Sequence, residues 1–177
     1  IDNDQKYYKK KYIENIESMI VDDHTLAGSP PGPEVIDWLE QLSFVNDYFQ
    51  SNDLPRVTTG RPESHREYLK VAKSKEIIML ITHFEKILDS MVDYEIETLH
   101  QTLHLTESLV LSVLFIKEYC TPQQLIRTNF ASQFHFTPKA IVGNEKDISL
   151  EDLRVDFDFA IKYAGNISQF LEESRKD

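Results

Sequence analysis

The sequence predicts an all-α fold, a single helical bundle of about six helices. Apolar residues recur at three- and four-residue spacings along most of the 177 residues, and no stretch of any length alternates polar and apolar residues. The few Gly (5) and Pro (7) residues fall mainly between these patterns. With 41% hydrophobic residues, a chain of this length buries the core of one ordinary domain.

Six segments carry the helical spacing. We expect helices at residues 2–22, 34–50, 63–89, 93–119, 122–133 and 150–174. The clusters "TLAGSPPGPE" and "NDLPRVTTGRP" end the first two helices, because Gly and Pro interrupt helical hydrogen bonding. The loop at 52–62 is where the chain would divide if it formed two units, but this loop is short enough for one compact domain. Residues 1–177 therefore form one helical domain, within which residues 1–51 are either part of the bundle or an N-terminal helical arm on a main bundle of residues 63–177.

The first two helices are each predicted from one apolar stripe. The first stripe consists of Tyr8, Tyr12, Ile16, Met19 and Ile20. The second consists of Val35, Trp38, Leu39, Leu42, Val45 and Phe49. Residues at these spacings share one face of an α-helix, so both helices should pack against a core.

The next two helices differ in polarity. The helix at 63–89 has a polar first half and an apolar second half, so its first turns should project from the body. In the fourth helix, residues 105–116 are apolar almost all round. This run has 12 residues and contains Glu107, whereas a membrane span needs about 20 apolar residues. We therefore expect a buried spine and no transmembrane segment.

The last two helices begin with capping signatures. Thr121 is the expected cap of the fifth helix, with Pro122 at its first position and Gln124 at its third. Ser149 and Asp152 repeat the pattern at the start of the sixth. The residues expected to be buried together are Ile81, Leu103, Val110, Leu111, Leu114, Phe115, Leu125, Leu153, Phe157 and Ile161.

Composition excludes several classes of function. The formal net charge of −11 and the pI near 5.0 argue against a nucleic-acid-binding protein, which usually has a basic face. The single cysteine, Cys120, excludes an internal disulfide and a cysteine-based zinc cluster, and suits a reducing compartment or a mitochondrial matrix. No glycine-rich phosphate loop is present. The acidic pairs Asp22-Asp23, Asp156/Asp158 and Glu172-Glu173 are typical of solvated faces and helix ends.

His100 and His104 have the four-residue spacing of metal-binding helices. Gln101, however, stands where a zinc protease helix carries its Glu base, and a third ligand would have to be His83 or His135. We therefore expect the pair to lie on a helix surface, against a neighbouring helix or another protein, and not to bind metal. The alternative is a metal- or ligand-binding helical-bundle enzyme that uses His100 and His104.

Nucleophilic catalysis has no better support. Cys120 follows a helix end, whose dipole raises a thiol pKa, and no base lies near it in the sequence. Ser108 and Ser112 lie one turn apart in the most apolar segment, where serines usually bond to backbone carbonyls. We expect that the protein is not an enzyme, that it binds no cofactor, and that it has no catalytic, cofactor-binding or metal-ligating residue.

The run "LHQTLHLTESLVLSVLFIKEYCTPQQL" resembles part of a known family. A Ser followed by apolar residues (Ser108 onward), then a turn and Thr-x-Gln-Gln-Leu from Thr121, matches the C-terminal helical domain of the mitochondrial chaperone family that assembles the ATP synthase α subunit. The glycine Gly143 and the run Asp152-Leu153-Arg154 resemble the family's later connection and last helix. The resemblance covers roughly residues 92–165.

The sequence also departs from that family. Ser132 or a neighbour stands where the family carries an acidic residue important for chaperone work. The Trp that precedes the family's glycine is missing before Gly143, "NEKDIS" replaces a His-Asp pair, and the family's N-terminal β-rich domain has no counterpart. The resemblance therefore implies a fold and a mitochondrial, matrix-side location, but it transfers no functional residues.

Together these observations predict a non-enzymatic protein-binding helical module. Its partner would be a protein subunit of a mitochondrial complex, most simply ATP synthase, bound through apolar surface between helices and an acidic rim. It would act either as an assembly factor or as a permanent accessory subunit of ATP synthase or another large complex. The departures from the family favour the accessory subunit, because a scaffold needs the fold but not the chaperone's cycle.

Overall fold

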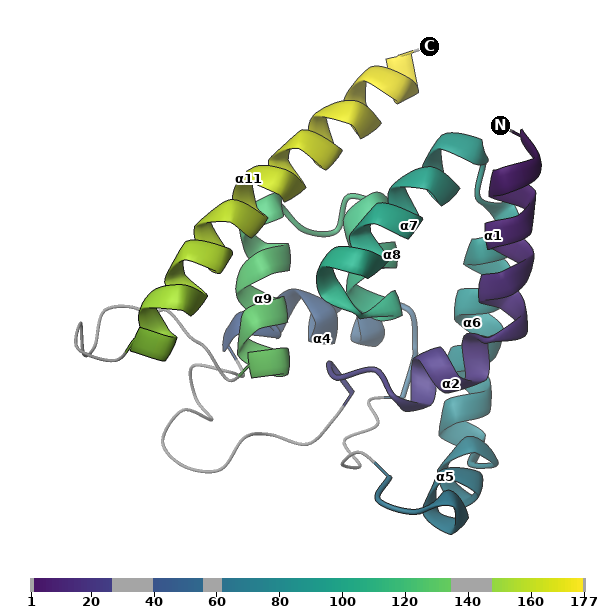
Figure 1. The fold of residues 1–177 in the computed structure, drawn as a ribbon. Coiled ribbons are helices and arrows are strands. Elements are labelled where there is room, and N and C mark those ends of the chain that lie inside the picture. Colours follow the sequence, from purple (N-terminus) through teal and green to yellow (C-terminus); the bar gives the residue numbers. More distant parts are fainter. Residues whose placement is uncertain (1, 27–39, 56–61, 135–147, 177) are drawn as a thin grey trace.

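The computed structural model describes residues 2–26, 40–55, 62–134 and 148–176, and within these ranges the fold is an all-α bundle without strands (Figure 1). The predicted fold class is confirmed, although nine helices lie in these ranges where about six were expected. The helices are α1 (Asp2–Glu14), α2 (Ile16–Val21), α4 (Ser43–Ser51), α5 (His65–Ala72), α6 (Lys75–Ser90), α7 (Asp93–Thr106), α8 (Leu109–Ile116), α9 (Pro122–Phe134) and α11 (Ile148–Lys176).

Three predicted helices are each divided in two. Asn15 separates α1 from α2, and the Ser74 hydroxyl caps α6 by accepting from the Ile77 amide at 3.3 Å. The predicted helix at 93–119 breaks where Glu107 adopts a left-handed backbone (φ 54°) and Ser108 caps α8, accepting from the Leu111 amide at 3.1 Å. Serine hydroxyls compete locally with helical hydrogen bonds, and apolar spacing does not reveal such breaks.

The second predicted helix is only partly described. Residues 27–39 lie outside the described ranges, so the predicted positions of Val35, Trp38 and Leu39 are not tested. In the described part, α4 begins at Ser43 and ends at Ser51. Leu42, Val45 and Phe49 of the predicted stripe are buried.

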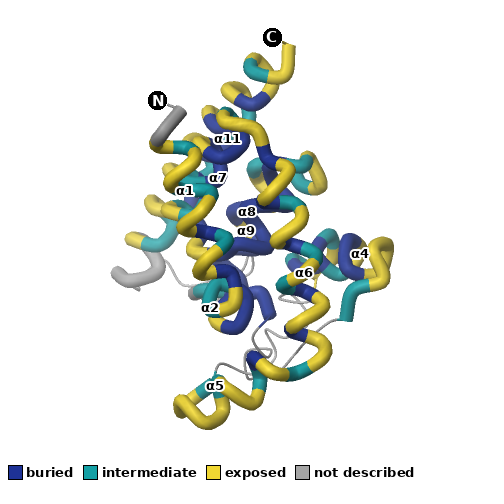
Figure 2. The backbone as a smooth tube through the Cα atoms, turned by 90° about the vertical axis from the view of Figure 1, so that its right-hand side faces the viewer, coloured by how far each residue is buried: buried dark blue, intermediate teal, exposed yellow. Residues whose placement is uncertain are grey.

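The short helix α8 lies in the middle of the bundle (Figures 1 and 2). It packs between α7 and α9, and α2 contacts its other side. The helix α1 packs on α6 and α7, while α11 lies along α9 and α7. All eight residues of α8 are buried, and its whole backbone is dark in Figure 2. The predicted spine at 105–116 is therefore a central buried helix from Leu109 onward.

The predicted core agrees largely with the observed one. Of the ten expected residues, those that are buried are Val110, Leu111, Leu114, Phe115, Leu125 and Phe157. The half-buried ones that pack against the core are Ile81, Leu103, Leu153 and Ile161. Large side chains of α2, α4 and α6 complete the same core, among them Ile20, Phe49 and Phe84.

The capping box predicted for the fifth helix is present at the start of α9. The Gln124 amide donates to the Thr121 hydroxyl at 3.1 Å, and the Thr121 amide donates to the Gln124 side-chain oxygen at 2.9 Å. The sixth helix, α11, begins at Ile148, one residue before the predicted cap, and the side chain of Ser149 lies outside the described residues. Among the described residues, no helix is both long and apolar enough to cross a membrane.

Candidate protein-interaction surface

A buried carboxylate holds the start of α8. Asp23 is 3% exposed and accepts from the Ser108 hydroxyl at 3.0 Å to each of its oxygens, and from the Val110 amide at 3.1 Å. It also accepts from the amide and hydroxyl of Thr25, at 3.0 and 2.7 Å. A carboxylate is stabilised at a helix N-terminus because the amides there are unpaired and the helix dipole is positive.

The pair Asp22-Asp23 was predicted to belong to a solvated face or a helix end, and both residues follow the end of α2, but Asp23 is not solvated. Asp22 is exposed, while Asp23 turns inward to satisfy α8. Its main partners are 85 and 87 positions away in the sequence, so no local signal marks it. Burial of a charged group needs such a set of donors, since an unpaired charge in the core is strongly destabilising.

The neighbouring His24 joins the same region to α9. Its Nε2 donates to the Thr106 carbonyl at 2.8 Å, so its Nδ1 accepts from the Ser132 hydroxyl at 2.6 Å when the ring is neutral. Both side chains are buried. A serine and an imidazole at this distance suit nucleophilic catalysis in an open site, but here both are enclosed in the core and tie the end of α2 to α9.

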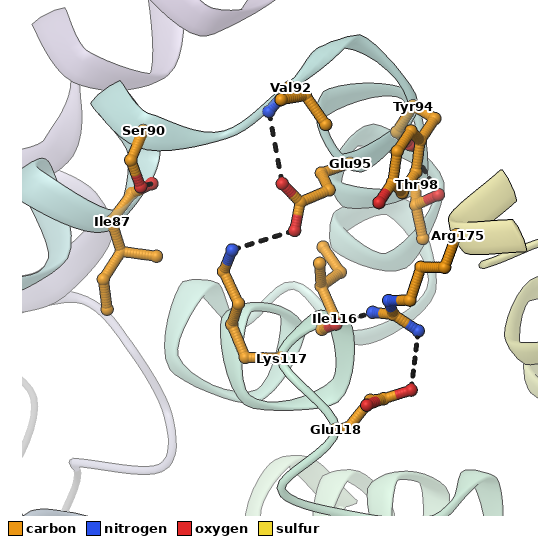
Figure 3. A network of polar contacts seen from close by, with 10 residues as sticks. All are labelled: Ile87, Ser90, Val92, Tyr94, Glu95, Thr98, Ile116, Lys117, Glu118 and Arg175. Carbon is orange, nitrogen blue, oxygen red and sulfur yellow. Dashed lines mark hydrogen bonds and ion pairs between the residues drawn. The ribbon is translucent and has the colours of Figure 1, made fainter. Parts of the chain in front are cut away.

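The end of α8 is held by the last turn of α11 (Figure 3). Arg175 donates to the Ile116 carbonyl and forms an ion pair with Glu118 at 2.8 Å. Beside it, Lys117 pairs with Glu95 at 2.8 Å, and Glu95 also accepts from the Val92 amide at 3.2 Å. A guanidinium at the negative end of a helix is favourable, so these contacts anchor the C-terminal end of α11 on the bundle.

One face of α11 packs on α9 and α7. Its buried residues are Phe157, Ala160, Ala164, Ile167 and Leu171. The rings of Phe157 and Phe130 meet edge to face, with centroids 5.2 Å apart. The two alanines keep the helix close to its neighbours. Together with the Arg175 contacts, this face holds α11 along much of its length.

A second face of α11 is apolar and exposed. Val155 is 60% exposed, Phe159 70%, Tyr163 39% and Phe170 38%. Spacings of four, four and seven residues place them on one side of the helix. We call these four residues the α11 stripe. Single exposed apolar residues are common, but a row of them on one helix face is typical of an interaction surface.

Acidic residues surround the α11 stripe. Asp152 and Glu173 lie at its two ends, and Asp156 and Asp158 lie beside it on either side, given about 100° of rotation per helical residue. All four side chains are exposed, as predicted for Asp156 and Asp158. We call these four the acidic rim. Lys162 lies nearby and carries the opposite charge.

The histidine pair lies where α7 meets α1. The Tyr12 hydroxyl is 2.5 Å from His100 Nδ1, the Tyr8 ring stacks on His100 with centroids 4.1 Å apart, and the Nε2 atoms of His100 and His104 are 3.3 Å apart. A surface hollow of about 320 Å³ lies beside them, also lined by Lys11 and Leu103. Burial, the neighbouring His104 and Lys11 lower the pKa of His100, so its ring is neutral at pH 7.

His83, one of the two third ligands considered for a metal, does not join this pair. His83 instead lies 2.5 Å from the Tyr48 hydroxyl, and His135 is outside the described residues. Among the described residues, no group of three or more His, Cys, Asp or Glu side chains is placed to hold a metal ion. His100 thus packs against the neighbouring helix α1 through two tyrosines.

The thiol of Cys120 is poorly suited to nucleophilic attack. Burial raises its pKa to about 12, so it stays protonated at neutral pH. The predicted direction is correct, but desolvation and not the helix dipole is the cause. Ser112 donates to the Ser108 carbonyl at 2.6 Å, as expected for a serine in an apolar helix.

Comparison with protein-family models, curated proteins and solved structures finds no match for this chain. The function of the protein is therefore inferred from the described surface. Within it, the α11 stripe stands out, because Val155 and Phe159 are mostly exposed and lie in one row with the partly exposed Tyr163 and Phe170.

Proposed function

We propose that this chain is a non-enzymatic helical module that binds another protein through the α11 stripe. The observation that carries the proposal is the exposure of four apolar side chains on one face of a helix that the bundle holds in place. Leaving Val155 and Phe159 in water forgoes roughly 1.5–3 kcal/mol for each large apolar side chain, relative to full burial. A partner that covers them recovers much of this free energy.

We further propose a mitochondrial, matrix-side setting, in which the module serves ATP synthase or another large complex. The support is the resemblance to the ATP synthase α-subunit assembly chaperone family. The all-α fold, the helix that follows Ser108 and the capped helix that follows Thr121 are compatible with it.

The role within that setting is either assembly factor or permanent accessory subunit. The position aligned with the family's acidic residue is Ser132 or a neighbour, and the Ser132 side chain is buried against His24. A side chain engaged in the core is not available to a client protein. This observation favours the accessory subunit.

Affinity purification of the tagged full chain from native mitochondria, followed by sizing, tests the proposal. Stable co-migration with an assembled complex supports an accessory subunit, and transient capture of a free subunit supports an assembly factor. Phe159→Asp should abolish capture, whereas Ile78→Asp, at another exposed apolar residue on α6, should not. Undiminished capture by Phe159→Asp would refute binding through the stripe.

Metal analysis separates this proposal from the histidine-based enzyme. Stoichiometric zinc or iron in the purified chain, lost in the double variant His100→Ala/His104→Ala, would replace the binding module by the metal-dependent alternative. The variant should otherwise capture the same partner as the unmodified chain, because the pair lies against α1 and contributes no side chain to the α11 stripe.

A further inference from the structure

We propose that the segment covering the α11 stripe is a basic amphipathic helix of the partner protein. This inference rests on the proposed function and specifies what the surface recognises. Three features of α11 carry it, namely the width of its apolar face, the length of the stripe and the charge of its surroundings.

The apolar face of α11 is wider than the part of it that packs against the bundle. At about 100° per residue, the buried positions from Phe157 to Leu171 occupy an arc of roughly 80°, and the stripe occupies a second arc of similar width beside it. A helix that packs on one side of a bundle needs an apolar arc of about 100°. The arc of α11 is roughly twice as wide, so the helix has room for a second packing partner.

The stripe is long and narrow, with the exposed Asn166 on the same side between Tyr163 and Phe170. It runs from Val155 to Phe170, which is about 22 Å or four turns at 1.5 Å per residue. Side chains at three- and four-residue spacings form ridges that fit the grooves of another helix. An extended strand would need an exposed sheet edge to pair with, and the described part of this chain has no sheet. A helix of four or five turns is the segment that fits.

The acidic rim determines the charge of that helix. Asp152, Asp156, Asp158 and Glu173 flank the stripe against one ammonium group, that of Lys162, so a docked helix brings its flanking residues close mainly to carboxylates. Lys or Arg at those flanks forms favourable pairs, whereas Asp or Glu is repelled. A second copy of this chain would place the same acidic rim against itself, in a protein that already carries a net charge of −11. A basic partner is therefore favoured over a homodimer.

Synthetic helical peptides of about 18 residues, added to the full chain, test the inference. One peptide has a leucine face flanked by lysines, a second has glutamates in place of the lysines, and a third is a scrambled form of the first. Fluorescence anisotropy should show binding of the lysine peptide that weakens as salt is raised. The glutamate and scrambled peptides should bind at least about tenfold more weakly. Equal binding of the lysine and glutamate peptides, or of the lysine and scrambled peptides, would overturn the inference.

Matched variants assign the binding to the stripe and its rim. Phe159→Asp should weaken the lysine peptide at least about tenfold, while Ile78→Asp leaves it unchanged. The double variant Asp156→Lys/Asp158→Lys should reverse the preference between the lysine and glutamate peptides. An unchanged preference for the lysine peptide would show that the acidic rim does not select the charge of the bound helix. Thermal unfolding of each variant checks that the fold is retained.

The outcomes separate this inference from the proposed function. If Phe159→Asp loses the mitochondrial partner but Asp156→Lys/Asp158→Lys keeps it, binding through the stripe stands and the basic helix is wrong. If neither change affects capture, both proposals fall. A concentration-dependent dimer in light scattering, abolished by Phe159→Asp, would assign the stripe to a second copy and would also overturn the inference.

Discussion

The helices α8 and α11 use apolar residues in opposite ways. In α8, all eight residues are buried, and its ends are held by a carboxylate from Asp23 and a guanidinium from Arg175. In α11, one apolar face is buried, while a second face, with Phe159 70% exposed, is left in water. Both helices contribute apolar side chains to the core, yet the bundle encloses α8 on all sides and covers α11 on one side.

The difference separates apolar side chains that stabilise the fold from apolar side chains that remain exposed to a partner. The apolar sequence of α8 is explained by its position in the core. All eight side chains are buried, and both helix ends are hydrogen-bonded by side chains of this protein. The stripe of α11 buries less of its apolar surface, because Val155 and Phe159 are 60% and 70% exposed. A helix that is held firmly on one side and apolar on the other is a suitable platform for a partner.

The largest expected effect is in α8. Leu111→Ala or Leu114→Ala should lower the free energy of unfolding by about 2–5 kcal/mol, because each leaves a cavity in a filled core. Phe159→Ala in α11 should change it by less than about 0.5 kcal/mol, as is usual for an exposed position. Urea denaturation measures both. A change below about 0.5 kcal/mol at both leucines would mean that α8 faces a partner and not its own bundle.

The next effect is at the start of α8. Asp23→Ala should cost about 1.5–3 kcal/mol, since it removes the acceptor of buried donors from Ser108 and Val110. Asp22→Ala, at the adjacent exposed carboxylate, should stay within about 0.5 kcal/mol. Chemical denaturation of the two variants side by side gives the comparison. Equal losses would contradict the assignment of the anchoring role to Asp23.

A smaller effect is expected at α9, which supports both α8 and α11. Thr121→Ala removes the hydroxyl that caps this helix and should cost about 1 kcal/mol. Gln123→Ala, an exposed position outside the capping box, is the control and should be nearly neutral. Capture of the partner through the α11 stripe should persist in both variants, measured alongside their melting temperatures.

The smallest effect concerns His100, which lies against Tyr8 and Tyr12 of α1. Burial lowers its pKa below the ordinary value of 6.5, so its contribution to stability is present above pH 6.5 and is lost as the pH falls through its folded pKa. When the pH is lowered from about 7 to about 5, the free energy of unfolding of the His100→Ala variant should therefore fall by less than that of the unmodified chain.

Some acid sensitivity should remain in that variant, because burial also lowers the pKa of His83, with Lys86 adding to the effect. Thermal unfolding across the pH series measures the two slopes. Identical slopes for His100→Ala and the unmodified chain would show that this histidine does not titrate differently in the folded state.

The sequence alone determined the features that depend on neighbouring residues. The all-α class follows from three- and four-residue spacing, and the capping box of α9 follows from Thr121 and Gln124, three positions apart. The burial of Val110, Leu111 and Leu114 was predictable for the same reason, since a segment that is apolar all round has no side to expose.

Only the tertiary structure decided what depends on distant partners. Asp22 and Asp23 are identical residues side by side, and burial of the second depends on Ser108, 85 positions away. Phe157 and Phe159 belong to one amphipathic helix, yet Phe157 is buried against Phe130 of α9 while Phe159 is 70% exposed. Local spacing specifies which faces are apolar, but the packing of other helices determines which of those faces is buried and which is left for a partner.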